Sequence, residues 1–273
     1  MTAFARSRSG LWQPKIPGVG MVEQMFLSMV NQLRTGQKLQ VIGNPGIEIY
    51  PKGGAVVVPW YLAGGTSIAN VIAAHQPLGA ASLAASYDDI AHVATTWNAA
   101  PGSAPTFDAS YGWLFDSSDV LNVGSGAIAS AVPLTMLCLF NPTNNTTDSI
   151  LIRIRDGTNA NSFSMVAYGS GGPDPCLIIT RASSSNAQAL STTFYTAGIW
   201  YVFAGVFAAT NSRSAYLNGA GKATNTTDKT PAGLNTTVIG TAAGKIAADA
   251  WYDIALSDAQ VLAVSNALLA LVT

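Results

Sequence analysis

Charged residues are scarce in this chain of 273 residues, because Asp, Glu, Lys and Arg together make up only 10% of it. An average protein carries about 25%. So little charge would hardly keep a free surface soluble, and we therefore expect partner chains to cover much of the surface. Glutamate is the scarcest of the four, since Glu23 and Glu48 are the only two.

Cysteine and histidine are also rare, with two of each. Cys138 and Cys176 lie in apolar runs, which predicts buried free thiols rather than a disulfide. His75 and His92 do not have a metal-ligand spacing, so each is expected to be a structural or a surface histidine. The sequence has no Gly-x-Ser-x-Gly nucleophile elbow and no phosphate-binding Gly-x-x-x-x-Gly-Lys loop. We predict no catalytic residue and no metal ligand.

Long hydrophobic runs are missing as well. No uninterrupted apolar stretch approaches the roughly 18 residues of a membrane-spanning helix. The first residues contain Gln13, Pro14, Lys15 and Pro17 where a secretory signal would be continuously apolar. We therefore expect no membrane segment and no signal peptide.

The charge that is present is unevenly distributed. Residues 1–52 hold six Lys/Arg and two Glu, a balance of +4, whereas residues 53–152 hold six Asp and no Lys or Arg, a balance of −6. This basic segment is too sparse in Lys and Arg for a typical nucleic-acid binder. We interpret it as an arm that docks on an acidic protein surface.

Residues 1–20 are rich in glycine and proline and predict an extended arm. Residues 21–33 carry apolar side chains at three- and four-residue spacing, which predicts a helix. That helix could pack on its own domain or against a neighbouring subunit. The residues predicted to dock the arm are Arg6, Arg8, Leu11, Trp12, Met25, Phe26 and Met29.

From about residue 100, short β-like runs alternate with turn residues, the pattern of a β-sandwich. Ile150, Ile152 and Ile154 alternate with Leu151, Arg153 and Arg155, so we expect the isoleucines to face the core and the arginines to face solvent. Residues 200–207 are apolar on both faces, which predicts a central or covered strand.

Three local signals mark turns and helix ends. Asn218-Gly219 is typical of a tight hairpin turn. Ser257 with Gln260 forms a capping box and predicts a helix that runs to about Leu271. Asp88-Asp89 precedes an apolar run and is interpreted as a helix N-terminal cap.

Several segments share a family pattern: Gly112–Phe115, Trp200–Val206 with Ala215–Gly219, Ile239-Gly240 and Trp251–Gln260. Over about residues 68–270 the chain resembles the laminin G-like, or concanavalin A-like, jelly-roll family, particularly its phage and prophage structural proteins. The resemblance implies an all-β concanavalin A-like jelly-roll sandwich with an N-terminal arm and helix and a short C-terminal helix. We place the arm, helix and a short β segment in residues 1–59 and the jelly roll in residues 60–273.

The resemblance also suggests two further functions to consider, glycan hydrolysis and calcium binding. Retaining glycan hydrolysis needs two carboxyl groups about 5 Å apart, but both glutamates precede the matched region. Asp116 and Asp119 could supply oxygen ligands to calcium, although a solvated turn is the favoured interpretation. We therefore expect no enzymatic activity and no cofactor.

The main functional hypothesis from the resemblance is a non-enzymatic phage virion structural protein. It would be a capsid decoration or another particle-surface protein, anchored by its arm to capsid or tail proteins and assembled in the host cytoplasm. A homo-oligomer, such as a trimer, is the default for particle symmetry. The alternative is a carbohydrate-binding module of a tail or fibre that adheres to host glycans. Its predicted sugar-stacking residues are Tyr87, Trp97, Tyr111, Trp113 and Tyr168.

Overall fold

The computed structural model describes residues 58–92, 95–116, 118–240 and 243–273, together with the backbone of four short strands nearer the N-terminus. The chain divides into two compact units, residues 1–58 and residues 59–273. In the first unit, β1 (Phe4–Arg6) pairs with β2 (Trp12–Pro14), and β3 (Leu39–Gln40) pairs with β4 (Glu48–Ile49). The helix predicted over residues 21–33 lies outside the described residues.

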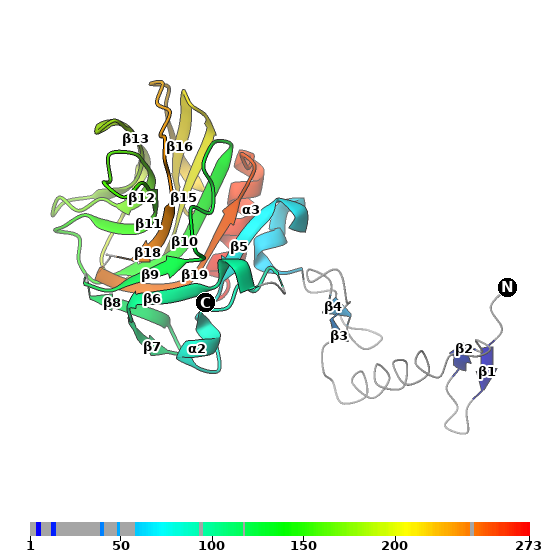
Figure 1. Cartoon of the computed structure of the whole chain (residues 1–273). Helices are drawn as coiled ribbons and strands as arrows, with labels where there is room; N and C mark the ends of the chain where they lie inside the picture. The colour runs from blue at the N-terminus through cyan, green and yellow to red at the C-terminus, as the bar shows by residue number, and fades with distance from the viewer. Residues whose placement is uncertain are drawn as a thin grey trace. The chain divides into compact units, whose positions relative to one another are not determined.

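The second unit is a sandwich of two antiparallel sheets (Figure 1). The eight-stranded sheet has the order β17 (Ala220–Asn225), β16 (Ser212–Leu217), β15 (Tyr201–Ala209), β10 (Leu134–Pro142), β19 (Ala243–Tyr252), β8 (Gly112–Asp116) and β7 (Thr106–Asp108), with β5 (Val71–His75) also paired to β19. The seven-stranded sheet has the order β14 (Ser185–Tyr195), β13 (Asp174–Ala182), β12 (Ser162–Ala167), β11 (Ser149–Arg155), β18 (Thr236–Gly240), β9 (Val120–Val123) and β6 (Ala99–Ser103). The all-β jelly-roll prediction is confirmed.

Few helices accompany the sheets. They are η1 (Trp60–Gly65), η2 (Ile68–Asn70), α2 (Leu83–Ser86), η3 (Thr95–Trp97) and α3 (Asp258–Leu269). The predicted capping box is present at the start of α3, where the Ser257 side chain accepts from the Gln260 backbone N–H and the Gln260 side chain accepts from the Ser257 N–H. No helix among the described residues is long and apolar enough to cross a membrane.

The main core lies between the sheets, and β15 shows how the sequence builds it. Phe203 and Phe207 alternate into this core, whereas Val202, Ala204 and Val206 point to the other side of the strand. The second set packs with Val261, Val264 and Leu268 of α3. The helix α3 covers the outer face of residues 200–207, which explains why they are apolar on both faces. The prediction of a covered strand is confirmed.

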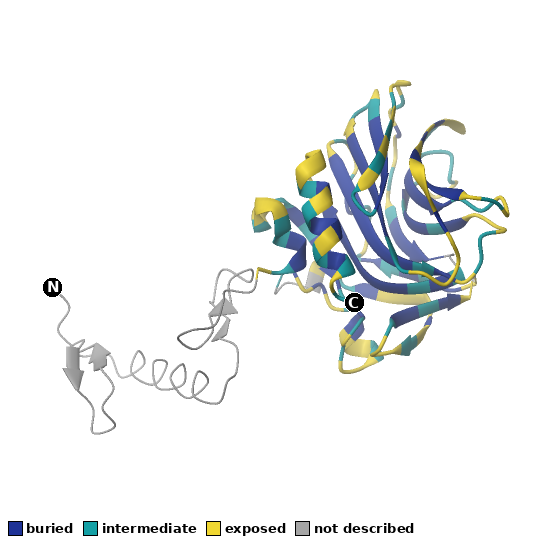
Figure 2. Ribbon diagram, turned by 180° about the vertical axis from the view of Figure 1, so that it is seen from behind, coloured by how far each residue is buried: buried dark blue, intermediate teal, exposed yellow. Residues whose placement is uncertain are grey.

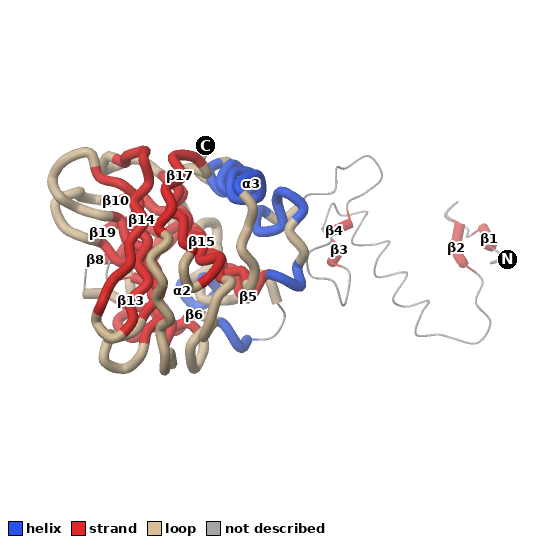
Figure 3. The backbone as a smooth tube through the Cα atoms, turned by 90° about the horizontal axis from the view of Figure 1, so that it is seen from above, coloured by secondary structure: helices blue, strands red, loops and turns tan. Residues whose placement is uncertain are grey.

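Helices therefore cover the outer face of the eight-stranded sheet. Seen from above, α3 lies to one side of the strands (Figure 3). From behind, the strands beside this helix are mostly in the dark blue of buried residues (Figure 2). Trp60 and Tyr61 of η1 belong to the same buried cluster as the inward side of α3. This face is closed to a large ligand.

A β-bulge changes the side-chain order predicted for β11. The register against β12 shifts between Ile150 and Ile152, so Leu151 and Ile152 both enter the core and Ile150 is only half-buried. Bulges place two residues opposite one and reset the alternation beyond them. After the bulge, Ile154 faces the core and the two arginines face outward, as predicted.

Candidate functional site

The outer side of β11 to β14 is the open face of the sandwich. No described helix packs against β11, β12 or β13. Strand register puts six side chains there in two adjacent rows, because side chains alternate along a strand. The rows are Arg153, Ser164 and Ile179, and Arg155, Ser162 and Arg181.

The serines form the floor of these rows. Ser162 is 3% exposed and Ser164 is 1% exposed, although no helix covers them. Their shielding must come from the longer, half-buried side chains on both sides. The open face therefore presents three guanidinium groups, those of Arg153, Arg155 and Arg181, with the two serine hydroxyl groups buried beside them. We call these three residues the arginine cluster.

Few N–H groups of the arginine cluster have a hydrogen-bond acceptor. Arg153 Nε donates to Ser164 Oγ at 3.2 Å, and Arg155 Nη1 donates to Asn159 Oδ1 at 2.9 Å. Arg181 Nε is buried without a hydrogen-bond partner. Burial, and then repulsion from Arg155 and Arg181, lowers the pKa of Arg153. Arg155 and Arg181 thus lie close enough to destabilise the charged form of Arg153.

The open face becomes apolar toward the C-terminal end of β14, away from the arginine cluster. Leu177 pairs with Leu190, and Pro175 pairs with Phe194. Leu190 is 40% exposed and Phe194 is 54% exposed, so both offer apolar surface to solvent. Six residue steps separate Arg181 from Pro175, about 20 Å along the strand. An extended ligand could contact both ends of the face.

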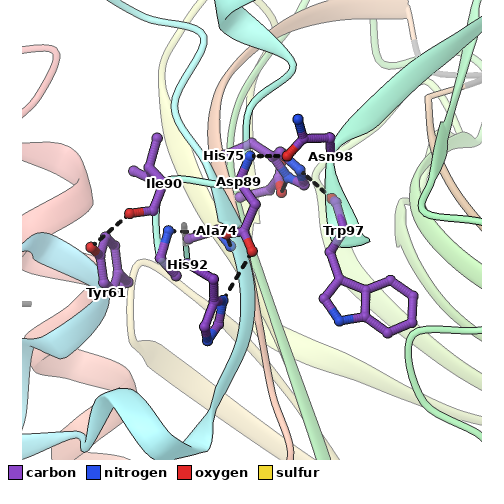
Figure 4. Close-up of polar contacts among 10 residues, drawn as sticks. Tyr61, Ala74, His75, Asp89, Ile90, His92, Trp97 and Asn98 are labelled. Carbon is purple, nitrogen blue, oxygen red and sulfur yellow. Dashed lines mark hydrogen bonds and ion pairs between the residues drawn. The ribbon is translucent and has the colours of Figure 1, made fainter. Parts of the chain in front are cut away.

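A second polar cluster lies buried beside β5 (Figure 4). His75 and Asp249 are both completely buried, and His75 Nδ1 lies 2.9 Å from Asp249 Oδ1. His75 Nε2 lies 2.9 Å from the Trp97 carbonyl oxygen, which can only accept, so this nitrogen carries a hydrogen. One further proton must then lie between Nδ1 and Oδ1. The cluster joins β5, β19 and the end of η3, so its role is structural, as predicted for His75.

Both pKa values of this pair are shifted upward. Burial alone would lower the pKa of His75, but the Asp249 charge and the hydrogen bonds to Asp249 and Trp97 raise it overall. Burial raises the pKa of Asp249, against the opposing effect of His75. The folded chain therefore holds protons at this pair more tightly than the unfolded chain does.

Asp89 does not cap a helix, which corrects the prediction for Asp88-Asp89. No helix includes residues 88–92. The Asp89 carboxylate instead accepts from the backbone N–H groups of Ala74 at 3.0 Å and Ala91 at 2.9 Å, and it contacts His92 Nδ1 at 2.9 Å (Figure 4). The carboxylate links the turn to β5, because a buried carboxylate needs donors and finds them both in the turn and in the strand.

The predicted stacking aromatics do not share one surface. Trp113 is completely buried in the inter-sheet core, where its Nε1 donates to Ser86 Oγ at 2.7 Å, so its ring offers no face to a sugar. Tyr87 and Trp97 pack partly buried against the same core. Tyr111 is half-buried with Lys245 Nζ 4.7 Å from its ring centre. Tyr168 is half-buried beside β13, and its carbonyl oxygen accepts from Tyr195 Oη.

The acidic residues considered for calcium lie in a hydrogen-bonded turn. Asp116 Oδ1 accepts from the Ser118 N–H and Oγ, and Asp119 Oδ2 accepts from the Asp116 N–H. Hydrogen bonds from the Ser118 side chain lower the pKa of Asp116. No group of three or more His, Cys, Asp or Glu among the described residues could hold a metal ion. Cys138 and Cys176 are buried and free, as predicted.

The arm residues cannot be placed. The side chains of the predicted docking set lie outside the described residues, and their role stays a prediction: Arg6, Arg8, Leu11, Trp12, Met25, Phe26 and Met29.

Sequence reasoning missed the open face, although one signal was available. Arg153 and Arg155 stand two positions apart on an otherwise apolar strand, in a chain where charge is scarce. Two arginines on the same face of a mostly apolar strand indicate that this face has a function. The partnership with Arg181 and the exposure of Phe194 depend on strand register and could not be read from spacing.

A family model described as the concanavalin A-like lectin/glucanases superfamily matches residues 115–262, which is 148 of the 273 residues. No curated protein matches the sequence.

Two solved structures illustrate the likeness of fold. Domain 4 of an extracellular arabinanase from Geobacillus stearothermophilus, in complex with arabinotriose, has a TM-score of 0.57 at 13% identity, with 72% of this chain and 98% of that one covered. The ligand-binding domain of botulinum neurotoxin serotype D, in complex with N-acetylneuraminic acid, has a TM-score of 0.52 at 15% identity, with 73% and 51% covered. The chain thus spans about half the length of the toxin domain. At such low identity the likeness concerns the fold alone.

Proposed function

Because the chain belongs to the concanavalin A-like lectin/glucanases superfamily, we propose that it is a non-catalytic carbohydrate-binding protein that holds a glycan against its open face. One observation carries this proposal. Helices close the outer side of the eight-stranded sheet, whereas the outer side of β11 to β14 is free of them and combines exposed apolar side chains with polar ones.

This combination suits a sugar. Carbohydrate-binding sites need apolar surface for the C–H faces of the rings and hydrogen-bonding groups for the hydroxyls, much as other ligand sites combine apolar lining with a few placed polar groups. Phe194 supplies exposed ring surface, and the half-buried arginine cluster supplies hydrogen-bond donors. The solved structures of similar fold that were crystallised with saccharides support the proposal.

Display on a phage particle is the finer part of the proposal. Two features support it: the separate unit formed by residues 1–58, and the balance of six basic residues to two glutamates in residues 1–52. In this proposal the basic arm anchors the chain on other virion proteins and leaves the jelly roll to contact the host glycan. The virion location and the oligomeric state stay predictions.

A glycan array probed with the full chain tests the proposed function. We expect binding to a limited set of glycans, and Phe194→Ala should weaken that binding by about fivefold, since an aromatic contact contributes about 1 kcal/mol. Ile199→Ala is the matched control, because Ile199 is equally exposed at 54% but lies in the turn before β15. Absence of binding to every glycan at millimolar concentration would refute the proposal. An equal loss in both variants would refute the role of Phe194.

A further inference from the structure

We propose that the arginine cluster binds an anionic substituent of the glycan, a carboxylate or a sulfate, so that the ligand is an acidic saccharide. This inference rests on the proposed function and adds the chemical class of the ligand. It follows from the geometry and hydrogen bonding of Arg153, Arg155 and Arg181.

The three guanidinium groups can reach one small anion. Arg155 and Arg181 flank Ser162 in one row, so their Cα atoms lie two strand spacings apart, about 10 Å. Arg153 lies two residues from Arg155 on the same face, about 7 Å along the strand. All three side chains are long, and a guanidinium forms paired hydrogen bonds with a carboxylate or sulfate oxygen pair.

No acidic side chain of the described residues forms an ion pair with the arginine cluster. Among the described residues, the ion pairs are those of His75 with Asp249, His92 with Asp89, and Lys222 with Asp258, and none includes a cluster arginine. A guanidinium has five N–H donors, yet among the described residues the acceptors for the cluster are Ser164 and Asn159, and Arg181 Nε has none. An anion would supply both the missing charge and the missing acceptors.

Arg213 shows what a structural arginine looks like in this chain. It is 1% exposed, and its three nitrogens donate to Thr180 Oγ1 at 2.9 Å, Asn225 Oδ1 at 2.6 Å and the Thr210 carbonyl oxygen at 2.6 Å. Those bonds tie the two sheets together. The cluster arginines lack such a set of partners, although they are only half-buried and Arg181 Nε has no acceptor at all.

The chain's own arm is a poor occupant for the cluster. Residues 1–52 carry a charge of +4 and contain only two glutamates. Two positively charged segments repel each other, which favours a ligand or a partner chain as the source of the anion. An acidic saccharide fits the proposed carbohydrate function, and carboxylates of a second copy of the chain are the competing source.

Calorimetric titration of the full chain with matched saccharide pairs tests the inference. One pair is oligogalacturonate and its methyl ester, and the other is sulfated and unsulfated dextran oligosaccharide. We expect the charged member of at least one pair to bind more tightly. Arg181→Gln and Arg153→Gln should each weaken that binding by about 10- to 100-fold, as expected for a charge-assisted hydrogen bond, and should weaken binding of the neutral member far less. The pair that responds identifies carboxylate or sulfate as the anion.

Lys222→Gln is the charge-matched control, since Lys222 is an exposed residue of β17 in the other sheet. Equal weakening by Lys222→Gln and Arg181→Gln would show general charge attraction and overturn the inference. Tight binding of neutral saccharides with no effect of the arginine variants would overturn it while leaving the proposed function standing. No binding of any saccharide would overturn both. If Arg181→Gln instead dissociates an oligomer on size-exclusion chromatography and leaves saccharide binding intact, the cluster binds a second copy and the inference fails.

Discussion

Replacing His75 with leucine should lower the free energy of unfolding by about 3–5 kcal/mol, the usual effect of breaking a completely buried charged pair. The variant leaves Asp249 buried without its partner, 2.9 Å away in the native protein. Asp249 Oδ2 already lacks a hydrogen-bond partner, so no other group can compensate. Urea denaturation followed by tryptophan fluorescence measures the change.

The pair also gives the native stability a predictable pH dependence. The pKa of His75 is raised in the folded chain, so the stability it contributes is complete below the unfolded value of about 6.5 and is lost as the pH rises through the raised pKa. The raised pKa of Asp249 acts with the same sign, because the folded state holds its proton more tightly. Unfolding free energy should therefore fall as the pH is increased above about 6.5.

Two variants separate this explanation from simple loss of packing. The double variant His75→Leu/Asp249→Leu removes both charges, so it should recover much of the stability and lose the fall above neutral pH. His92→Leu breaks the other His–Asp contact, in which the His92 side chain is 34% exposed, and should change stability by only about 0–1 kcal/mol. A double variant as unstable as the sum of its single variants would contradict the charged-pair account.

Replacing Gly219 with valine should destabilise the chain by about 2–5 kcal/mol. Asn218 and Gly219 have φ values of 54° and 70°, and Leu217 pairs with Ala220 across them, which makes a two-residue hairpin turn between β16 and β17. A β-branched residue at positive φ costs about 1–2 kcal/mol. A Cβ atom at Gly219 would also lie 2.6 Å from the Leu262 Cα of α3, and overpacking of this kind adds about 1–3 kcal/mol.

Gly171→Val separates the two causes. Gly171 has a φ of 80°, but a Cβ atom there would meet nothing within 4 Å. Its substitution should therefore show the conformational effect alone, about 1–2 kcal/mol. The melting temperatures of both variants give the comparison. Equal shifts would show that contact between the turn and α3 contributes nothing.

The parts of the fold that could be predicted are those with a local physical cause. The turn at Asn218-Gly219 follows from backbone preference, and the helix start at Ser257 follows from capping. The covered strand at residues 200–207 follows from apolarity on both faces. Each of these signals needs only a few neighbouring residues to be interpreted.

What could not be predicted depends on long-range register. The bulge at Ile150–Ile152 arises from pairing with β12, and Asp89 binds β5 because the fold brings that strand beside it. Aromatic type alone could not distinguish the buried Trp113 from the exposed Phe194. The arginine cluster combines residues 26 positions apart, Arg155 and Arg181, that only the sheet brings together.

The most direct test of the central claim is a crystal structure of the full chain with the glycan that binds most tightly on the array. We expect sugar rings along the outer side of β11 to β14, with Phe194 against a ring and an anionic substituent within hydrogen-bond distance of Arg181. A glycan bound over α3, or at Tyr111 on the opposite sheet, with β11 to β14 unoccupied, would contradict it.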